Sequence, residues 1–185
     1  MAGETGARAP GPHGLTHVTA QGVRMVDVTP KAVTHREAVA RGRIRLSPDA
    51  VALLRESGGR SAKGDVFTTA QVAGILAAKR TSDLIPLAHP ITLSRTDVRL
   101  ELTDEAVEIE SVCATAGQTG VEMEALTAVS ATALTIYDMM KAVDRSMVVE
   151  GIRLVRKTGG RSGIWQRPSE GRPENGNEGA FESPF

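Results

Sequence analysis

An acidic and a basic side chain stand three residues apart near the end of a long apolar segment. The segment runs from Gly120 to Val143, and Asp138 and Lys141 are its only charged residues after Glu124. Residues three apart on a helix share a face, so these two groups can form an ion pair. Because burial and a neighbouring charge shift pKa values, such a pair is suited to proton transfer. A purely structural ion pair is the alternative, and the pair alone does not decide between the two.

The segment itself is predicted to be a long helix. Its apolar residues recur at three- and four-residue steps, and no Gly or Pro interrupts its interior. The uncharged run, residues 125–137, is shorter than the ~20 residues that a membrane-spanning helix needs. Small Ala, Ser and Thr side chains suit close packing, so we expect a helix that is buried on several sides of a soluble protein.

Composition limits the possible functions. The chain has 185 residues, of which 41% are hydrophobic, with 22 basic and 22 acidic side chains. This length and content suit one domain with a substantial core. A balanced charge argues against a nucleic-acid partner. The single cysteine, Cys113, cannot form an internal disulfide, and neither a secretion signal nor a membrane span is visible, so we expect a cytoplasmic protein without a membrane partner.

The two ends differ in composition from the middle of the chain. Residues 1–14 and 164–185 are rich in Gly, Pro and polar residues, and we expect disordered tails there. Residues 15–163 then form a single domain. Within it, residues 37–46 alternate between apolar and charged positions, which predicts a strand with one buried face. Ser47 is a good N-cap for a short helix over residues 49–57.

The remaining elements complete a recognisable order. A second helix is predicted over residues 69–80, a hairpin around the acidic turn 103–105, then the long helix, and a last strand around residues 152–154. The order β-α-α-β-β-α-β is the split βαβ arrangement of ferredoxin-like folds. We therefore predict an α+β fold with an antiparallel sheet and helices packed on one of its faces.

Three loops place polar groups beside these elements. Gly58–Asp65 carries Lys63 among glycines, and Lys157–Gly163 repeats that chemistry. Each loop could bring backbone N–H groups and an ammonium to a phosphate. The first loop lacks the P-loop spacing and alone could be a plain turn. Leu84–Pro90 holds His89 before a proline, which favours an extended backbone. Two cationic glycine loops in a neutral chain indicate an anionic ligand.

The four histidines do not indicate a metal. His89 alone could equally be structural, and His13, His17 and His35 show no metal-ligand spacing. We therefore predict no metal site and no cofactor.

Four segments together resemble one family. They are KGDVFTTAQVAGILAAKRTSDLIPLAHP from Lys63, the segment Gln118–Leu126, TIYDMMKAV around Asp138, and KTGGRSG from Lys157. Over roughly residues 15–163 the chain resembles the cyclic pyranopterin monophosphate synthase family of molybdenum cofactor biosynthesis. The resemblance is more specific than any single motif because it includes turns as well as helices.

The resemblance implies both an assembly and a reaction. It implies a ferredoxin-like subunit in a homohexamer, built as a trimer of dimers. It also implies a lyase that acts on a small molecule, (8S)-3',8-cyclo-7,8-dihydroguanosine 5'-triphosphate. In this reaction the purine-derived ring is rearranged to a pyranopterin, diphosphate leaves, and a cyclic phosphate forms. The site must therefore transfer protons and bind a polyanion.

Site residues follow from their positions in the matching motifs. The resemblance implies that Asp138 is the catalytic acid or base, Lys141 its partner, and Lys63 a further catalytic group. Two departures from the family pattern are Ala88, where a cysteine is common, and Ser61–Ala62, where histidines can precede the lysine. The substrate-binding residues that the resemblance implies are Leu87, Ala88, His89, Glu122, Met123, Glu124, Arg36 and Lys157.

Helix geometry adds an expectation of its own. Glu124 and Asp138 are fourteen residues apart, which is ~21 Å along a helix. One small ligand can hardly touch both residues of the same chain. If both serve one pocket, either the substrate is very extended or the two residues come from different subunits across a symmetric interface, and we expect the interface.

Two other functions compete with this interpretation. A non-catalytic phosphate-ligand sensor on the same fold would explain the cationic loops without Asp138. An RNA-binding module shares the split βαβ order, but the sequence lacks an aromatic strand on which bases could stack.

Overall fold

One antiparallel sheet forms the centre of the molecule. The computed structural model describes residues 18–19 and 22–168. The expected tail at 1–14 and most of the expected tail at 164–185 lie outside these residues. The strand order is β6-β7-β3-β8-β9, and every neighbouring pair is antiparallel. The strands are β3 (Thr34–Arg45), β6 (Arg95–Leu102), β7 (Ala106–Gly117), β8 (Val148–Thr158) and β9 (Trp165–Gln166).

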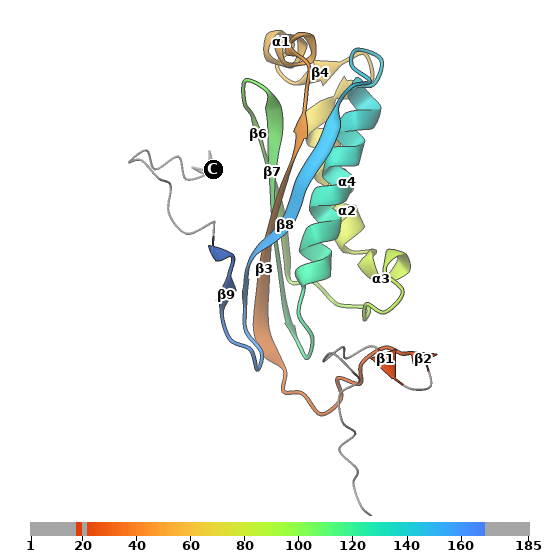
Figure 1. Cartoon of the computed structure of the whole chain (residues 1–185), viewed down its shortest axis with the longest axis vertical. Coiled ribbons are helices and arrows are strands. Elements are labelled where there is room, and N and C mark those ends of the chain that lie inside the picture. Colours follow the sequence, from red (N-terminus) through yellow and green to blue (C-terminus); the bar gives the residue numbers. More distant parts are fainter. Residues whose placement is uncertain (1–17, 20–21, 169–185) are drawn as a thin grey trace, which may run out of the picture.

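Two helices cover one face of this sheet. They are α2 (Val66–Ala78) and α4 (Glu122–Met140), which run side by side in Figure 1. The predicted α+β ferredoxin-like class, with its order β-α-α-β-β-α-β, is confirmed. The shorter elements are α1 (Pro48–Glu56), α3 (Thr81–Leu84), and two small hairpins, β1 (Val18–Thr19) with β2 (Gly22–Val23), and β4 (Arg60–Ser61) with β5 (Gly64–Asp65).

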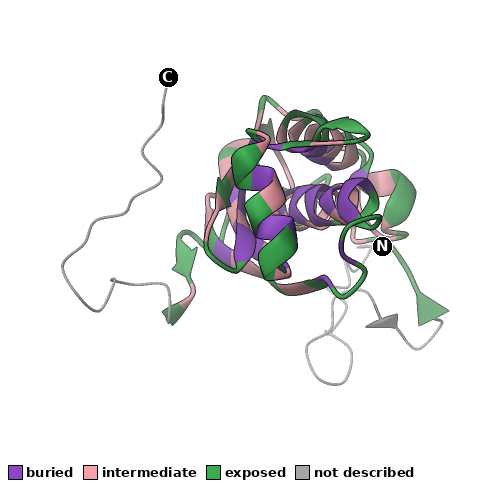
Figure 2. Ribbon diagram, turned by 90° about the horizontal axis from the view of Figure 1, so that it is seen from above, coloured by how far each residue is buried: buried purple, intermediate pink, exposed green. Residues whose placement is uncertain are grey.

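The core lies between the sheet and the two helices. On β3 the predicted alternation is confirmed, because Ala38, Ala40 and Ile44 are buried while the charged residues between them are not. Figure 2 shows buried residues along the inner sides of the helices. Gly74 lets α2 and α4 approach closely, since a Cβ atom there would overlap the Thr132 hydroxyl.

Capping residues set where the shorter helices begin. The Ser47 hydroxyl accepts a hydrogen bond from the Ala50 N–H at 3.3 Å, which confirms the predicted N-cap of α1. Helix α2 begins at Val66, three residues before the predicted start. The cause is Asp65, whose carboxylate accepts from the Thr68 N–H at 2.8 Å and caps the first turn.

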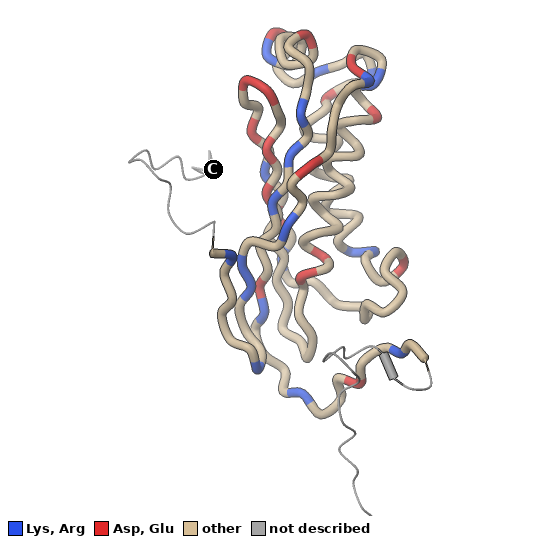
Figure 3. The backbone as a smooth tube through the Cα atoms, viewed as in Figure 1, with Lys and Arg blue, Asp and Glu red and all other residues tan. Residues whose placement is uncertain are grey.

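Charged residues cover the other face of the sheet. Arg41 lies 2.8 Å from Glu110, and Arg43 lies 2.8 Å from Glu150. Figure 3 shows basic residues along β3 and β8. The folded part also continues beyond residue 163, because β9 pairs with Arg156 and Lys157 of β8. Among the helices of the described residues, none is long and apolar enough to cross a membrane.

Candidate active site

The predicted site residues form two groups at opposite ends of α4. One group surrounds Asp138 in its last turn, and the other surrounds Glu122 at its start. Glu122 and Asp138 are sixteen positions apart, which corresponds to ~24 Å along the helix axis. Within one chain the structure therefore keeps the two groups apart, as the helix geometry predicted (Figure 1).

Asp138 is held between two lysines. One carboxylate oxygen, Oδ1, lies 2.7 Å from Lys141 Nζ, and the other, Oδ2, lies 2.8 Å from Lys63 Nζ. Lys63 also donates to the backbone carbonyl of Asp138 at 2.6 Å. Hydrogen bonds from Lys141 and Lys63 lower the pKa of Asp138 to about 2. The carboxylate is therefore ionised at neutral pH, between two ammonium donors and open to solvent.

Separate elements bring these three groups together. Lys63 lies in the tight turn between β4 and β5, where Gly64 adopts a φ of 119° that glycine tolerates best. Asp138 belongs to the last turn of α4, and Lys141 is its C-cap residue. The cluster thus depends on the β4–β5 hairpin, which lies within the loop that the sequence predicted only as a glycine turn.

The second group begins with two cations on neighbouring strands. Side chains two residues apart on a strand point to the same face, so Arg36 faces the helix side of the sheet with Ala38. Lys157 is the register partner of Ala38, and directly opposed residues also share a face. Both cations therefore lie on the face that α4 covers, next to the start of that helix.

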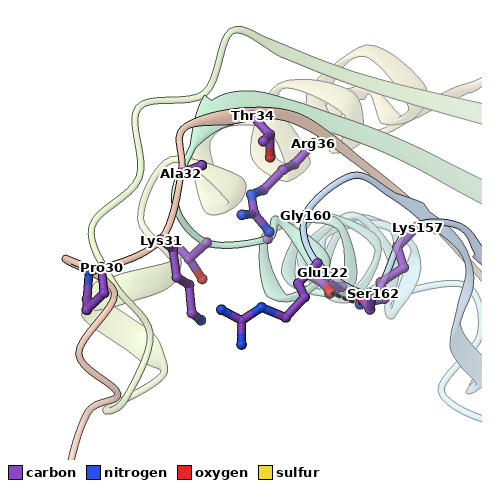
Figure 4. A pocket seen from close by; sticks show the side chains of 12 residues that line it. Pro30, Lys31, Ala32, Thr34, Arg36, Glu122, Lys157, Gly160 and Ser162 are labelled. Carbon is purple, nitrogen blue, oxygen red and sulfur yellow. Dashed lines mark hydrogen bonds and ion pairs between the residues drawn. The ribbon is translucent and has the colours of Figure 1, made fainter.

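A cavity of about 940 Å³ opens at this position. In Figure 4, Lys31 and Arg36 point into it from one side, while Glu122, Lys157 and Ser162 lie on the other. The four cations of the wall outnumber its one carboxylate, which favours an anionic ligand. The lining residues are Pro30, Lys31, Ala32, Thr34, Arg36, Thr119, Gly120, Glu122, Lys157, Gly160, Arg161 and Ser162.

Polar contacts hold the cationic side chains in place. Arg36 donates from Nε to the Gly117 carbonyl at 2.9 Å. Lys157 donates to the Ser162 hydroxyl at 2.8 Å and lies 3.4 Å from Glu122 Oε1. A single carboxylate therefore offsets only part of the positive charge around the cavity.

A second cavity of about 330 Å³ adjoins the first, and both include Lys31 and Glu122 in their walls. His89 Nε2 lies 2.9 Å from the Val26 carbonyl. A carbonyl only accepts, so Nε2 carries a proton and donates the hydrogen bond to Val26. The lining residues are Val26, Val28, Lys31, Leu87, Ala88, His89, Ile91, Thr119, Gly120, Glu122, Met123 and Glu124.

Glu124 lies in the wall of this second cavity as a buried carboxyl group. Only 3% of the Glu124 surface is exposed to solvent. Burial raises the pKa of Glu124 to about 7, and the nearby charge of Glu122 acts in the same direction. A carboxyl group that titrates near neutral pH can exchange protons or accept N–H groups of a ligand.

The structure thus brings eight of the predicted site residues into two adjoining cavities and leaves the three catalytic candidates elsewhere. The sequence did not single out Lys31, Thr34, Arg161 or Ser162. Arg161 and Ser162 follow Lys157 in the loop that the sequence predicted to bind an anion, and membership of that loop could have identified them. Lys31 lies in a segment without periodicity, so nothing in the sequence marked it.

Comparison with known proteins gives a consistent result. A sequence model described as the MoaC family matches residues 25–160. A protein of Thermomicrobium roseum is 56% identical over 159 residues, covering 84% of this chain and 95% of the relative. Proteins of Chloroflexus aurantiacus and Heliobacterium modesticaldum are each 58% identical, covering 83% of this chain and 95% and 97% of those relatives. All three relatives carry the name cyclic pyranopterin monophosphate synthase.

Proposed function

The chain belongs to the MoaC family, and on this basis we propose that it is a phosphorus–oxygen lyase of molybdenum cofactor biosynthesis. It converts (8S)-3',8-cyclo-7,8-dihydroguanosine 5'-triphosphate to cyclic pyranopterin monophosphate and releases diphosphate. The observation that carries this proposal is the large cavity whose wall has four cations, Lys31, Arg36, Lys157 and Arg161, against the single carboxylate of Glu122.

The triphosphate of the substrate occupies this cavity. Arginine and lysine donors form charge-assisted hydrogen bonds with phosphate oxygens, which are stronger than bonds between neutral groups. The N-terminus of α4 begins at Glu122 in the same wall, and a helix N-terminus also favours anions. Arg36 and Lys157 are the main anchors, because each already has a partner that fixes its side chain.

The ring system occupies the adjoining smaller cavity. Leu87, Ala88 and Met123 supply its less polar wall, while His89 and Glu124 supply its polar groups. An ionised Glu124 accepts hydrogen bonds from N–H groups of the guanine-derived ring. The bond from His89 Nε2 to the Val26 carbonyl fixes the imidazole ring in the cavity wall.

Asp138, Lys63 and Lys141 perform the proton transfers. Formation of the cyclic phosphate requires that a substrate hydroxyl attacks the phosphorus nearest the sugar and that diphosphate departs. The hydroxyl proton passes to a base, and Asp138 is ionised at neutral pH. The two lysine ammonium groups beside it supply protons and stabilise the charge that develops on phosphate oxygens.

Because these groups lie at the other end of α4, a complete site combines two subunits. Asp138, Lys63 and Lys141 of one protomer face the two cavities of its partner across a two-fold interface. The assembly is a homohexamer, a trimer of such dimers, and it acts in the cytoplasm.

Turnover by the purified chain tests this proposal. The cyclic triphosphate is supplied as substrate, and diphosphate and cyclic pyranopterin monophosphate are measured together. The two products should appear in equal amounts. Binding of the substrate without any turnover would instead support a phosphate-ligand sensor.

A further inference from the structure

The Arg36 side chain lies against a glycine of the loop that follows β8. Gly160 has a φ of 69°. A Cβ atom at this position would overlap Arg36 Nη1 and lie 2.9 Å from Cζ. On its other side the guanidinium is tied by the bond from Nε to the Gly117 carbonyl. The guanidinium therefore occupies space that exists only because residue 160 has no side chain.

The same loop also holds the second anchor of the cavity. Ser162 accepts the hydrogen bond of Lys157 at 2.8 Å, which is shorter than the 3.4 Å from that ammonium to Glu122. In Figure 4 Ser162 lies beside Lys157, and Gly160 lies beyond the end of Arg36. Two residues of one short loop thus contact the two cations that β3 and β8 contribute.

We propose that residues 159–162 are a positioning segment that orients Arg36 and Lys157 toward a polyphosphate. Gly160 acts by leaving space for the guanidinium, and Ser162 acts by accepting a hydrogen bond from the ammonium. This inference rests on the proposed function, and it assigns to the loop the alignment of two donors for one triphosphate. Neither residue takes part in proton transfer, so the segment governs binding of the triphosphate.

Gly160→Ala tests the space beside Arg36, and Gly163→Ala is its matched control. Gly163 has a φ of 61°, and a Cβ atom there meets nothing within 4 Å. Both substitutions place an L side chain at a similar positive φ, so they carry similar backbone strain. The affinity of the full-length chain for inorganic triphosphate is measured by calorimetry. Gly160→Ala should weaken it about tenfold or more, as expected for a displaced charge-assisted donor, and Gly163→Ala less than about twofold.

A double substitution shows whether the effect passes through Arg36. Lysine lacks the Nη1 and Cζ atoms that a Cβ at residue 160 would meet. In an Arg36→Lys background, Gly160→Ala should therefore weaken triphosphate binding less than about threefold. An undiminished loss in that background would overturn the positioning role, as would equal losses for Gly160→Ala and Gly163→Ala.

Substitutions of Ser162 provide a second test of the positioning segment, one that does not require a change at Gly160. Ser162→Ala should raise KM for the cyclic triphosphate more than it lowers kcat. Ser162→Thr retains the hydroxyl and should restore KM to near the original value. If Gly160→Ala does not fold, this pair decides, and identical KM values for Ala and Thr at position 162 would contradict the proposal.

These outcomes are separable from the proposed function. A chain that binds triphosphate but never converts the cyclic substrate disproves the lyase activity. A chain that converts the substrate equally well with Gly160→Ala and with Ser162→Ala disproves only the positioning segment.

Discussion

Lys63 Nζ lies 2.8 Å from Asp138 Oδ2 and 2.6 Å from the carbonyl oxygen of the same residue. The lysine therefore fixes both the side chain and the end of α4. Lys141 binds the other carboxylate oxygen. The carboxylate is held in one orientation by two cations that belong to different parts of the fold.

Asp138→Asn should lower turnover by roughly 10²–10⁴-fold, because the amide retains the shape of the side chain but cannot accept a proton. Turnover of the cyclic triphosphate is the measurement. Asp104→Asn is the control, since Asp104 lies in the β6–β7 turn and forms an exposed ion pair with Arg55 of α1. Near-normal turnover in Asp138→Asn would remove Asp138 from the chemistry.

Replacing Arg36 or Lys157 with an uncharged residue should weaken binding of the substrate's phosphate groups more than binding of its ring system. Arg36→Gln or Lys157→Gln should weaken binding of the triphosphate substrate by about tenfold or more, and binding of its dephosphorylated analogue much less. Arg43→Gln is the control, because Arg43 pairs with Glu150 on the opposite face of the sheet. Equal losses for the two ligands would indicate that the anchor has a structural role.

The raised pKa of Glu124 predicts an acid limb in the activity profile. If the ionised carboxylate binds the ring, kcat/KM should fall as pH drops below about 7, the pKa of this group. Glu124→Gln should lower kcat/KM and remove that limb. A profile whose acid limb is unchanged in the variant would assign the titration to another group.

Ionisation of Glu124 should also lower the stability of the folded protein, whereas it raises activity. Between pH 4.5 and about 7 the folded state keeps the Glu124 proton while the unfolded state has lost it. The free energy of unfolding should therefore decrease as pH rises through this window, by about 3 kcal/mol. Glu124→Gln should not show this decrease, which chemical denaturation of both proteins at several pH values can establish. If the free energy of unfolding changes with pH in the same way in the original protein and in Glu124→Gln, Glu124 is not a buried carboxyl group with a raised pKa.

Local signals allowed much of the fold to be predicted from the sequence. Ser47 and the proline after it located the start of α1, and the small residues of α4 indicated a helix buried on several sides. The first residues of β3 were missed because their polar side chains do not alternate with apolar ones, although they pair with β7. The two residues of β9 are too few to give any pattern, and only pairing with β8 makes them a strand.

The site was harder to predict because it depends on spatial neighbours. The motifs identified Asp138 and Lys157, and helix geometry predicted the distance between the two groups. Lys31 enters the cavity wall from a segment without periodicity. The contact between Gly160 and Arg36 joins residues 124 positions apart, and no sequence spacing marks such a pair.

Mixing two impaired variants, assayed at substrate concentrations well below KM, tests the central claim that each site is shared between subunits. Asp138→Asn and Arg36→Gln, carried on separately tagged chains, are co-assembled in equal amounts, and oligomers that carry both tags are isolated to prove mixing. In a symmetric dimer of one of each, one site has both defects and the other has neither. Random pairing should then restore about a quarter of the original activity. Activity that stays at the level of the separate variants, in oligomers shown to be mixed, would contradict the shared site.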